Sequence, residues 1–201
     1  MQTEIEAKFI DIDINEMRQR LERVGAVLEQ PMRDMRRALI EEPQHAAEHS
    51  FIRIRDEGDQ VTLTYKRHAE NDAARIDSAR EIETTVGDFD ATIAIFEASG
   101  WHFKTYQESR RETWKLGDVE IVIDEWPWIQ PYIEIEAQSS DEVQNVAELL
   151  GFSWDDAVFG TVDVIYNRDF PAMTVRGVID IHEVRFSDPI PAEFKPKGVA
   201  S

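Results

Sequence analysis

The sequence has no cysteine among its 201 residues. This absence excludes disulfides, a thiolate metal site and a cysteine nucleophile, and it is typical of cytoplasmic proteins. There is also no apolar run near the ~18 residues that a membrane span needs. The first residues, MQTEIEAKF, lack the apolar stretch of a secretory signal. We therefore expect a cytoplasmic protein with no membrane partner.

Basic residues are scarce, because 22 Lys and Arg stand against 41 Asp and Glu, giving a formal net charge of -19. Duplex nucleic acid is excluded as a partner, since binding to its phosphates needs a surplus of basic groups on the surface. A smaller polyanion can bind only if the basic residues gather in one place. The hydrophobic content of 42% is that of a globular protein. We expect one domain over residues 1–170, followed by a tail, residues 171–201, to which we assign no chemistry.

Alternation of polar and apolar residues dominates the sequence and predicts strands. The segments are TEIEAKFID, MRDMRRALIEE, SFIRIRD, VTLTYKR, SAREIETTV, WHFKTYQESRRETWKL, VEIVIDE and YIEIEAQ. The turn DEGD, with Gly58 at its tip, predicts a hairpin. Helical spacing and capping residues predict helices over 14–25, 89–99 and 141–150, and a short helix within 161–170. The fold class is therefore α+β.

Sorting each strand by parity separates one polar and one apolar side. The polar sides hold Glu4, Glu6, Lys8, Arg53, Arg55, Thr62, Thr64, Lys66, Glu81, Glu83, Ser109, Arg111, Glu120, Asp124, Glu134 and Glu136. An open sheet with this side in water is one interpretation. However, acids and bases are segregated by strand, which favours a closed barrel whose polar lumen brings opposite charges together. The three longer helices would then cover its apolar outside.

Such a lumen suits a phosphate compound bound with a metal ion. Carboxylates bind Mg²⁺ or Mn²⁺ through oxygen, and Arg and Lys side chains hold phosphate oxygens. Together they supply the charge neutralisation that phosphoryl transfer requires.

The segment EIEAK resembles the ExExK signature of the CYTH superfamily, also called triphosphate tunnel metalloenzymes. FIRIR, LTYK, REIE, SRRETW, VIDEWP and YIEIE follow in the same order, so the resemblance covers roughly residues 1–150. The superfamily includes class IV adenylyl cyclases, thiamine triphosphatases and inorganic triphosphatases. The resemblance implies an eight-stranded antiparallel tunnel with helices outside, which binds a triphosphate together with Mg²⁺ or Mn²⁺.

The resemblance also implies roles for individual residues. Metal binding falls to Glu4, Glu6, Glu81, Asp124, Glu134 and Glu136. Phosphate binding falls to Lys8, Arg53, Arg55, Lys66 and Arg111. Lys8, Arg55 and Glu83 are the candidate catalytic residues. The family often has Lys-x-Arg on its sixth strand, and here Ser109 stands in place of that Lys. Either Arg110 or Lys104 compensates, or one phosphate contact is missing.

Our leading hypothesis is a metal-dependent triphosphatase acting on tripolyphosphate, a nucleoside triphosphate or thiamine triphosphate. The His-Phe pair that precedes ExExK in several cyclases is absent, which favours a hydrolase over the alternative, a class IV adenylyl cyclase. A second alternative is a polyphosphate- or nucleotide-binding module without turnover. An outer sheet face is a candidate surface for a homodimer.

Three further signals carry no function in our interpretation. HAAEH, residues 45–49, fits an inverted zinc peptidase pattern, but Pro43 and the following strand leave no room for a long helix, so we predict a loop. DIDIN, residues 11–15, imitates a calcium loop but has a helical continuation, so helix capping explains it better. Trp126 and Trp128 are predicted to cover a barrel rim rather than stack on a nucleobase.

Overall fold

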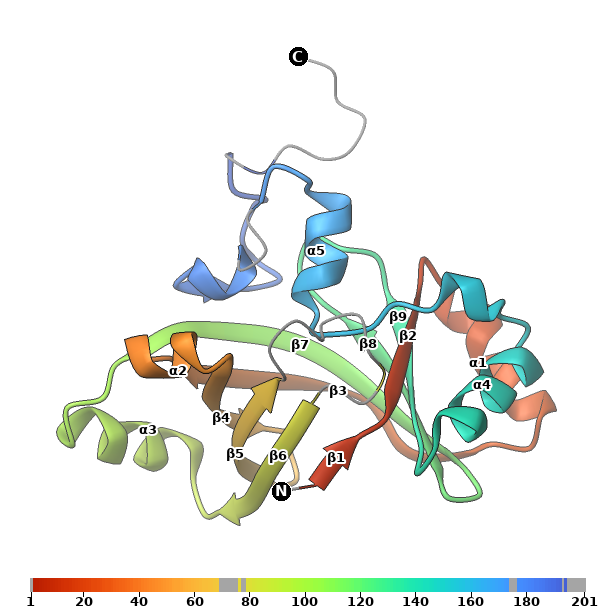
Figure 1. The fold of residues 1–201 in the computed structure, drawn as a ribbon, viewed down its shortest axis with the longest axis horizontal. Coiled ribbons are helices and arrows are strands. Elements are labelled where there is room, and N and C mark those ends of the chain that lie inside the picture. The colour runs from red at the N-terminus through yellow and green to blue at the C-terminus, as the bar shows by residue number, and fades with distance from the viewer. Residues whose placement is uncertain (1, 69–75, 77–78, 174–176, 193, 195–201) are drawn as a thin grey trace.

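The computed structural model describes residues 2–68, 76, 79–173, 177–192 and 194. Within them, nine strands form one antiparallel sheet in the order β1-β6-β5-β4-β3-β7-β8-β9-β2 (Figure 1). Their bounds are β1 (Gln2–Glu4), β2 (Glu6–Ile10), β3 (Val27–Ile40), β4 (Ser50–Asp56), β5 (Val61–His68), β6 (Ala79–Val86), β7 (Phe103–Leu116), β8 (Val119–Glu125) and β9 (Tyr132–Glu136). The predicted α+β class and the predicted strand segments are confirmed.

The two ends of this strand order, β1 and β2, follow each other in the chain with only Ile5 between them. β1 pairs with β6, and β2 pairs with β9. The first predicted strand is therefore interrupted, which is why the structure has nine strands where the resemblance implied eight. β1 and β2 are thus nearly continuous in the chain, and each pairs with one of the strands, β6 and β9, at the two ends of the remaining sheet.

The long strands β3 and β7 run antiparallel along most of their length. β3 begins at Val27, earlier than the predicted start at Met32, and it contains Pro31. The register shifts between Gln30 and Arg33, so the proline falls where the ladder is irregular. A residue without an N–H group is tolerated at such a bulge.

Two helices, α1 (Ile14–Arg23) and α4 (Ser140–Leu149), lie together against one outer face of the sheet (Figure 1). Asp13 accepts a hydrogen bond from the Glu16 N–H at the start of α1, which confirms the interpretation of DIDIN as a helix cap. Leu21 is fully buried in the core that these helices form with β2, β8 and β9. Burial of such a side chain contributes about 1.5–3 kcal/mol.

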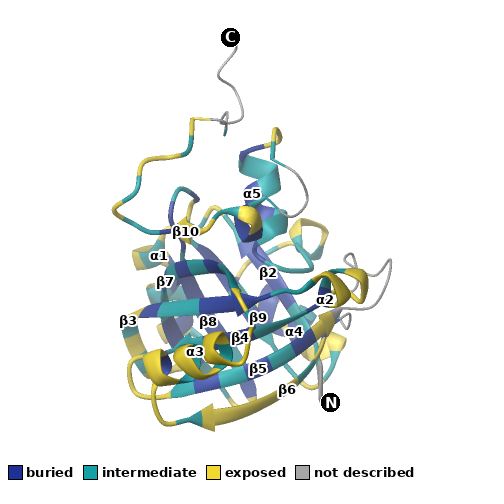
Figure 2. Cartoon of the chain, turned by 90° about the vertical axis from the view of Figure 1, so that its left-hand side faces the viewer, coloured by how far each residue is buried: buried dark blue, intermediate teal, exposed yellow. Residues whose placement is uncertain are grey.

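A third helix, α3 (Phe89–Ala98), covers the sheet near β4 through Phe89, which packs on Ile54 and Ala38. It carries many exposed residues, and so does β6 (Figure 2). The predicted helices over 14–25, 89–99 and 141–150 are all present within one or two residues of their predicted ends. The prediction of a loop over HAAEH is wrong in part. Pro43, at the first turn, starts a helix of five residues, α2 (Pro43–Ala47).

The C-terminal segment packs on the domain rather than extending away from it. It comprises η1 (Trp154–Asp156), α5 (Asp163–Asp169), η2 (Val178–Asp180) and β10 (Glu183–Val184), which pairs in parallel with β7. Tyr166 of α5 is fully buried and donates a hydrogen bond to the Pro127 carbonyl at 2.7 Å. Val178 and Val184 join the same apolar cluster. In the described part of the chain, no helix is long and apolar enough to cross a membrane.

Candidate active site

A cavity of about 300 Å³ lies among the polar faces of the strands. Its charged lining residues are Glu4, Glu6, Lys8, Arg37, Arg53, Arg55, Lys66, Glu81, Glu83, Arg111, Glu120, Glu134, Glu136 and Asp163. All the predicted site residues are in this lining except Asp124. Strand alternation brings them together, because residues of one parity face the same side.

Five of the carboxylates form what we call the acidic wall, which consists of Glu4, Glu6, Glu81, Glu134 and Glu136. The register of β2 with β9 sets Glu6 opposite Glu136 and Lys8 opposite Glu134. Lys8, only 3% exposed, places its Nζ atom 2.6 Å from Glu6 Oε1 and 2.9 Å from Glu134 Oε2. Lys66 from β5 forms an ion pair with Glu4. Two ammonium groups therefore separate the carboxylates of this wall.

These two lysines do not neutralise the whole wall. Burial, together with the neighbouring Glu134, Glu4 and Glu6, raises the pKa of Glu136 to about 8. Burial and the adjacent Glu4 carboxylate raise the pKa of Glu81 to about 7. In contrast, Lys8 and Arg111 outweigh burial and hold the pKa of Glu134 well below its ordinary value. The two lysines thus leave a surplus of acidic groups, which Glu136 and Glu81 relieve by keeping a proton near neutral pH, whereas Glu134 stays ionised.

Four guanidinium groups form what we call the basic wall, which consists of Arg37, Arg53, Arg55 and Arg111, on β3, β4 and β7. Arg53 is 8% exposed, and its Nε atom has no hydrogen-bond partner among the described residues. Its Nη2 atom donates to Thr64 Oγ1 at 3.3 Å and lies 3.5 Å from Glu83 Oε2. Burial, then Arg55 and Arg37, lower the pKa of Arg53 to about 9. This cation is buried among like charges and is incompletely hydrogen-bonded.

Arg111 is held from behind by Asp124. Its Nε and Nη2 atoms donate to the two Asp124 carboxylate oxygens at 2.7 and 2.6 Å, while Glu134 Oε1 lies 3.9 Å from Nη2. Asp124 is 1% exposed and does not line the cavity. The sequence suggested Asp124 as an acidic group near a metal. The structure places it as the bidentate partner that orients Arg111.

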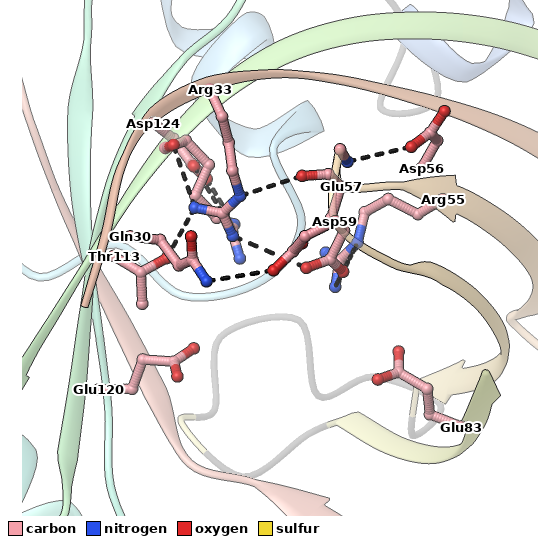
Figure 3. A network of polar contacts seen from close by, with 12 residues as sticks. Gln30, Arg33, Arg55, Asp56, Glu57, Asp59, Glu83, Thr113, Glu120 and Asp124 are labelled. Carbon is pink, nitrogen blue, oxygen red and sulfur yellow. Dashed lines mark hydrogen bonds and ion pairs between the residues drawn. The ribbon is translucent and has the colours of Figure 1, made fainter.

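Arg55 is held by a carboxylate from the tip of the β4–β5 hairpin. Glu57 is 7% exposed, and its Oε1 atom accepts from Arg55 Nε at 2.7 Å (Figure 3). Arg33 donates to the Glu57 carbonyl at 3.2 Å, and Gln30 donates to Asp59 at 3.1 Å. The hairpin, with Gly58 at a φ of 93° as its turn predicted, is therefore fastened to β3 beside the basic wall.

Neither candidate for replacing the missing lysine at Ser109 enters the cavity. Lys104 forms ion pairs with Glu41 at 2.8 Å and with Asp180. Arg110 donates to Asp34 at 2.9 Å and its guanidinium lies 4.3 Å above the ring of Phe186. Neither side chain therefore replaces the lysine within the cavity, which leaves the alternative that one phosphate contact is missing at this position.

Several residues of the cavity lining, and Glu57 beside it, were missed by sequence reasoning. Arg37 stands between Met35 and Leu39 on the same strand face, so the local pattern is apolar and gave no polar signal. Glu57 lies in a turn, where strand parity does not apply. The lining residues Thr161 and Asp163 come from the start of α5, beyond the segments that resemble the family.

The aromatic and histidine signals have structural roles. Trp128 donates from Nε1 to the Asp188 carbonyl at 2.8 Å and packs on Phe194, so its contacts are with the C-terminal segment. Trp126, in contrast, is 6% exposed and lines the cavity. His45 stacks on Trp101 with ring centroids 5.5 Å apart. Among the described residues, no group of three or more His, Asp or Glu side chains is arranged as a ready metal site.

Comparison with known proteins identifies the family. Residues 2–153 match the CYTH domain. Similar solved structures include a conserved hypothetical protein from Pyrococcus furiosus, with a TM-score of 0.64, 21% identity, and coverage of 77% of this chain and 94% of that one. A candidate adenylate cyclase from Vibrio parahaemolyticus gives a TM-score of 0.68 at 12% identity, covering 82% of this chain and 97% of that one.

A third similar structure, a candidate adenylyl cyclase from Hippeastrum, is described as having a dominant triphosphatase activity. It has a TM-score of 0.53 and 11% identity, and the match covers 80% of this chain and 91% of that one. At such identities the likeness shows the fold alone. Among curated proteins, none matches the chain significantly. Because the family match extends from β1 to beyond β9 and includes both walls of the cavity, the chain belongs to the CYTH domain family.

Proposed function

We propose that this protein is a divalent-metal-dependent triphosphatase and that its strands close into a tunnel around the substrate. The observation that carries this proposal is the separation of charge in one cavity, with carboxylates on β1, β2, β6 and β9 and guanidinium groups on β3, β4 and β7. A ligand that satisfies both walls must contain a cation and a polyanion. A triphosphate bound with Mg²⁺ or Mn²⁺ has this composition.

The acidic wall suits a hard divalent cation. Its donors are oxygen atoms only, which Mg²⁺ and Mn²⁺ prefer. Glu81 Oε2 is buried and accepts no hydrogen bond within the described part of the chain. Glu4, Glu6, Glu134 and Glu136 would hold the metal, and the first three would exchange contacts that they now make with Lys8 and Lys66. When bound, the metal would polarise the terminal phosphoryl group and lower the pKa of a water molecule.

The other residues of the cavity would position and neutralise the triphosphate. Arg53, Arg55, Lys66 and Arg111 would hold its oxygens, with the Arg forks giving bidentate contacts. Lys8, released from one carboxylate, would neutralise charge on the transferred phosphoryl group. Glu83 is held by a 2.7 Å hydrogen bond from Thr64 and would accept a proton from the attacking water. Water attacks the terminal phosphorus and the bond to the bridging oxygen breaks. Orthophosphate leaves together with diphosphate from tripolyphosphate, ADP from ATP or thiamine diphosphate from thiamine triphosphate.

The test is an assay of the purified protein with tripolyphosphate, ATP and thiamine triphosphate, each with Mg²⁺ or Mn²⁺. Orthophosphate, diphosphate and cyclic AMP are measured together. The proposal predicts release of orthophosphate without cyclic AMP, and loss of release when the metal is chelated. Absence of turnover with every substrate and metal would overturn it and would support a binding module without catalysis.

Adenylyl cyclase activity is the second candidate. The observation that favours it is the apolar part of the cavity lining, where Leu39, Phe51 and Trp126 could accommodate a nucleobase. In this reaction the ribose 3′-hydroxyl attacks the α-phosphate and diphosphate leaves. The same assay decides, because cyclic AMP and diphosphate would form together from ATP.

A further inference from the structure

Arg37 is a cation of the cavity that no sequence motif marks. It lies on β3, and its guanidinium stacks 4.3 Å above the ring of Trp126. Its Nε atom donates to Gln107 Oε1 at 2.8 Å. Burial lowers the pKa of Arg37 only to about 10, so the side chain remains positively charged at neutral pH. A charged group is therefore held in a fixed orientation inside the cavity.

The register of the sheet places Arg37 at the centre of the basic wall. Arg37 pairs directly with Arg55 across β3 and β4, and both side chains line the cavity. Like charges directly opposite each other are unfavourable in a sheet. An anion bound between them would remove this repulsion and would gain two guanidinium contacts.

The same register relates Arg37 to Ser109, which stands where the family often has a lysine. On the other side of β3, Arg37 pairs with Gln107 and Met35 pairs with Ser109, so Arg37 and Ser109 are diagonal neighbours on one face. Ser109 contributes no charge to the lining. Lys104 and Arg110, on the same strand as Ser109, are engaged with carboxylates away from the cavity.

We propose that Arg37 binds the phosphate chain of the substrate and supplies from β3 the positive charge that β7 lacks at Ser109. This inference rests on the proposed function, because it assigns a ligand contact in the same cavity. Gln107 acts as the positioning residue, since it accepts from Arg37 and donates through Nε2 to the Val178 carbonyl at 3.2 Å. The C-terminal segment thereby holds Arg37 in place, although it lies outside the family match.

The experiment is a calorimetric titration of the full chain with tripolyphosphate in the absence of metal, so that the readout is binding and not turnover. Arg37→Gln should weaken binding about ten- to a hundredfold, which is the scale of a charge-assisted hydrogen bond. Arg36→Gln is the matched control. Arg36 is the next residue on the same strand, but its side chain pairs with Asp56 at 2.9 Å and lies over Phe89 on the outer face. Its affinity should equal that of the wild type.

Two further variants separate a ligand contact from a structural effect. Arg37→Lys keeps the charge and should retain more affinity than Arg37→Gln. The double variant Arg37→Gln with Ser109→Lys should regain affinity, because the new ammonium group enters the same face diagonally. Thermal melting of each variant without ligand checks that the fold is kept. A contact with the phosphate predicts loss and rescue of affinity at similar melting temperatures.

The failure of this inference differs from the failure of the proposed function. If the wild type binds tripolyphosphate and Arg37→Gln binds it equally well, Arg37 is not a ligand and the inference is overturned. If affinity is lost but Ser109→Lys does not restore any of it, the compensation between β3 and β7 is overturned. If the wild type itself binds no tripolyphosphate, with metal or without, the proposed function fails and this inference fails with it.

Discussion

The two walls of the cavity differ in where their counter-charges lie. On the acidic wall, the partners of the carboxylates are Lys8 and Lys66, which are inside the cavity. On the basic wall, Asp124 holds Arg111 from behind and Glu57 holds Arg55 from the hairpin. The basic wall is therefore pre-organised for an anion, whereas the acidic wall must exchange partners before it binds a metal. We expect triphosphate binding to tolerate the absence of metal better than catalysis does.

The largest expected effect comes from the acidic wall. Glu4→Gln removes one carboxylate charge and should lower kcat by more than about hundredfold, because even outer partners of metal ligands contribute 10- to 100-fold. Metal-free affinity for tripolyphosphate should stay the same or rise. Phosphate release and calorimetry measure the two quantities. Equal losses of turnover and of metal-free binding would contradict the assignment of metal binding to the acidic wall and of phosphate binding to the basic wall.

The next effect is on stability and concerns the back of the basic wall. Asp124→Asn leaves the buried guanidinium of Arg111 without its charged partner, which should lower the free energy of unfolding by about 3 kcal/mol. Urea unfolding measures this loss. Because Asp124 lies outside the cavity lining, the metal concentration that gives half-maximal activity should not change. A large rise in that concentration would instead identify Asp124 as a metal ligand.

A pH effect should follow from the surplus charge of the acidic wall. The raised pKa of Glu136, about 8, means that the folded metal-free protein keeps a proton that the unfolded chain loses near its ordinary pKa. Between these values the folded state binds more protons, so stability falls as pH rises from about 5 to 8. The melting temperature in EDTA should drop by a few degrees over this range. Glu136→Gln should reduce the drop, and an unchanged drop would refute the assignment.

The smallest effect concerns the hairpin. Glu57→Gln removes the carboxylate that orients Arg55, so affinity for tripolyphosphate should fall about two- to tenfold. Asp59→Asn, on the same hairpin, is the control, because Asp59 contacts Gln30 and no arginine of the basic wall in the described structure. Stronger binding in Glu57→Gln would contradict this role and would show that Glu57 competes with phosphate for Arg55.

Much of the fold could be predicted because periodicity and helix signals agree. Residues such as Asp13, Asp88 and Ser139 cap the three longer helices as their sequence context indicates. The charged strand faces also predicted which residues would line one cavity. Sequence patterns did not predict Arg37 as a lining residue. Its nearest neighbours on the same strand face, Met35 and Leu39, are apolar, so the local pattern indicated an apolar face.

The direction of a side chain near the end of a strand also could not be predicted from the sequence. Asp124 has the same parity as Glu120, which lines the cavity, yet its partner Arg111 draws it behind the lining. Lys104 and Arg110 were candidates only because of their positive charge. Their outward ion pairs depend on residues distant in the sequence, such as Glu41 and Asp34, which no local pattern could connect to them.

The interruption at Ile5 bears on how the protein folds. β1 pairs with a strand that starts at Ala79, and β2 pairs with one that ends at Glu136, so both pairings join segments that are far apart in the sequence. Contacts of such sequence separation form slowly because loop closure precedes them. Glu4, Glu6, Glu134 and Glu136 all lie on strands that take part in these two pairings. The candidate site therefore assembles only when these long-range steps of folding are complete, and a partly folded chain would lack the full set of carboxylates.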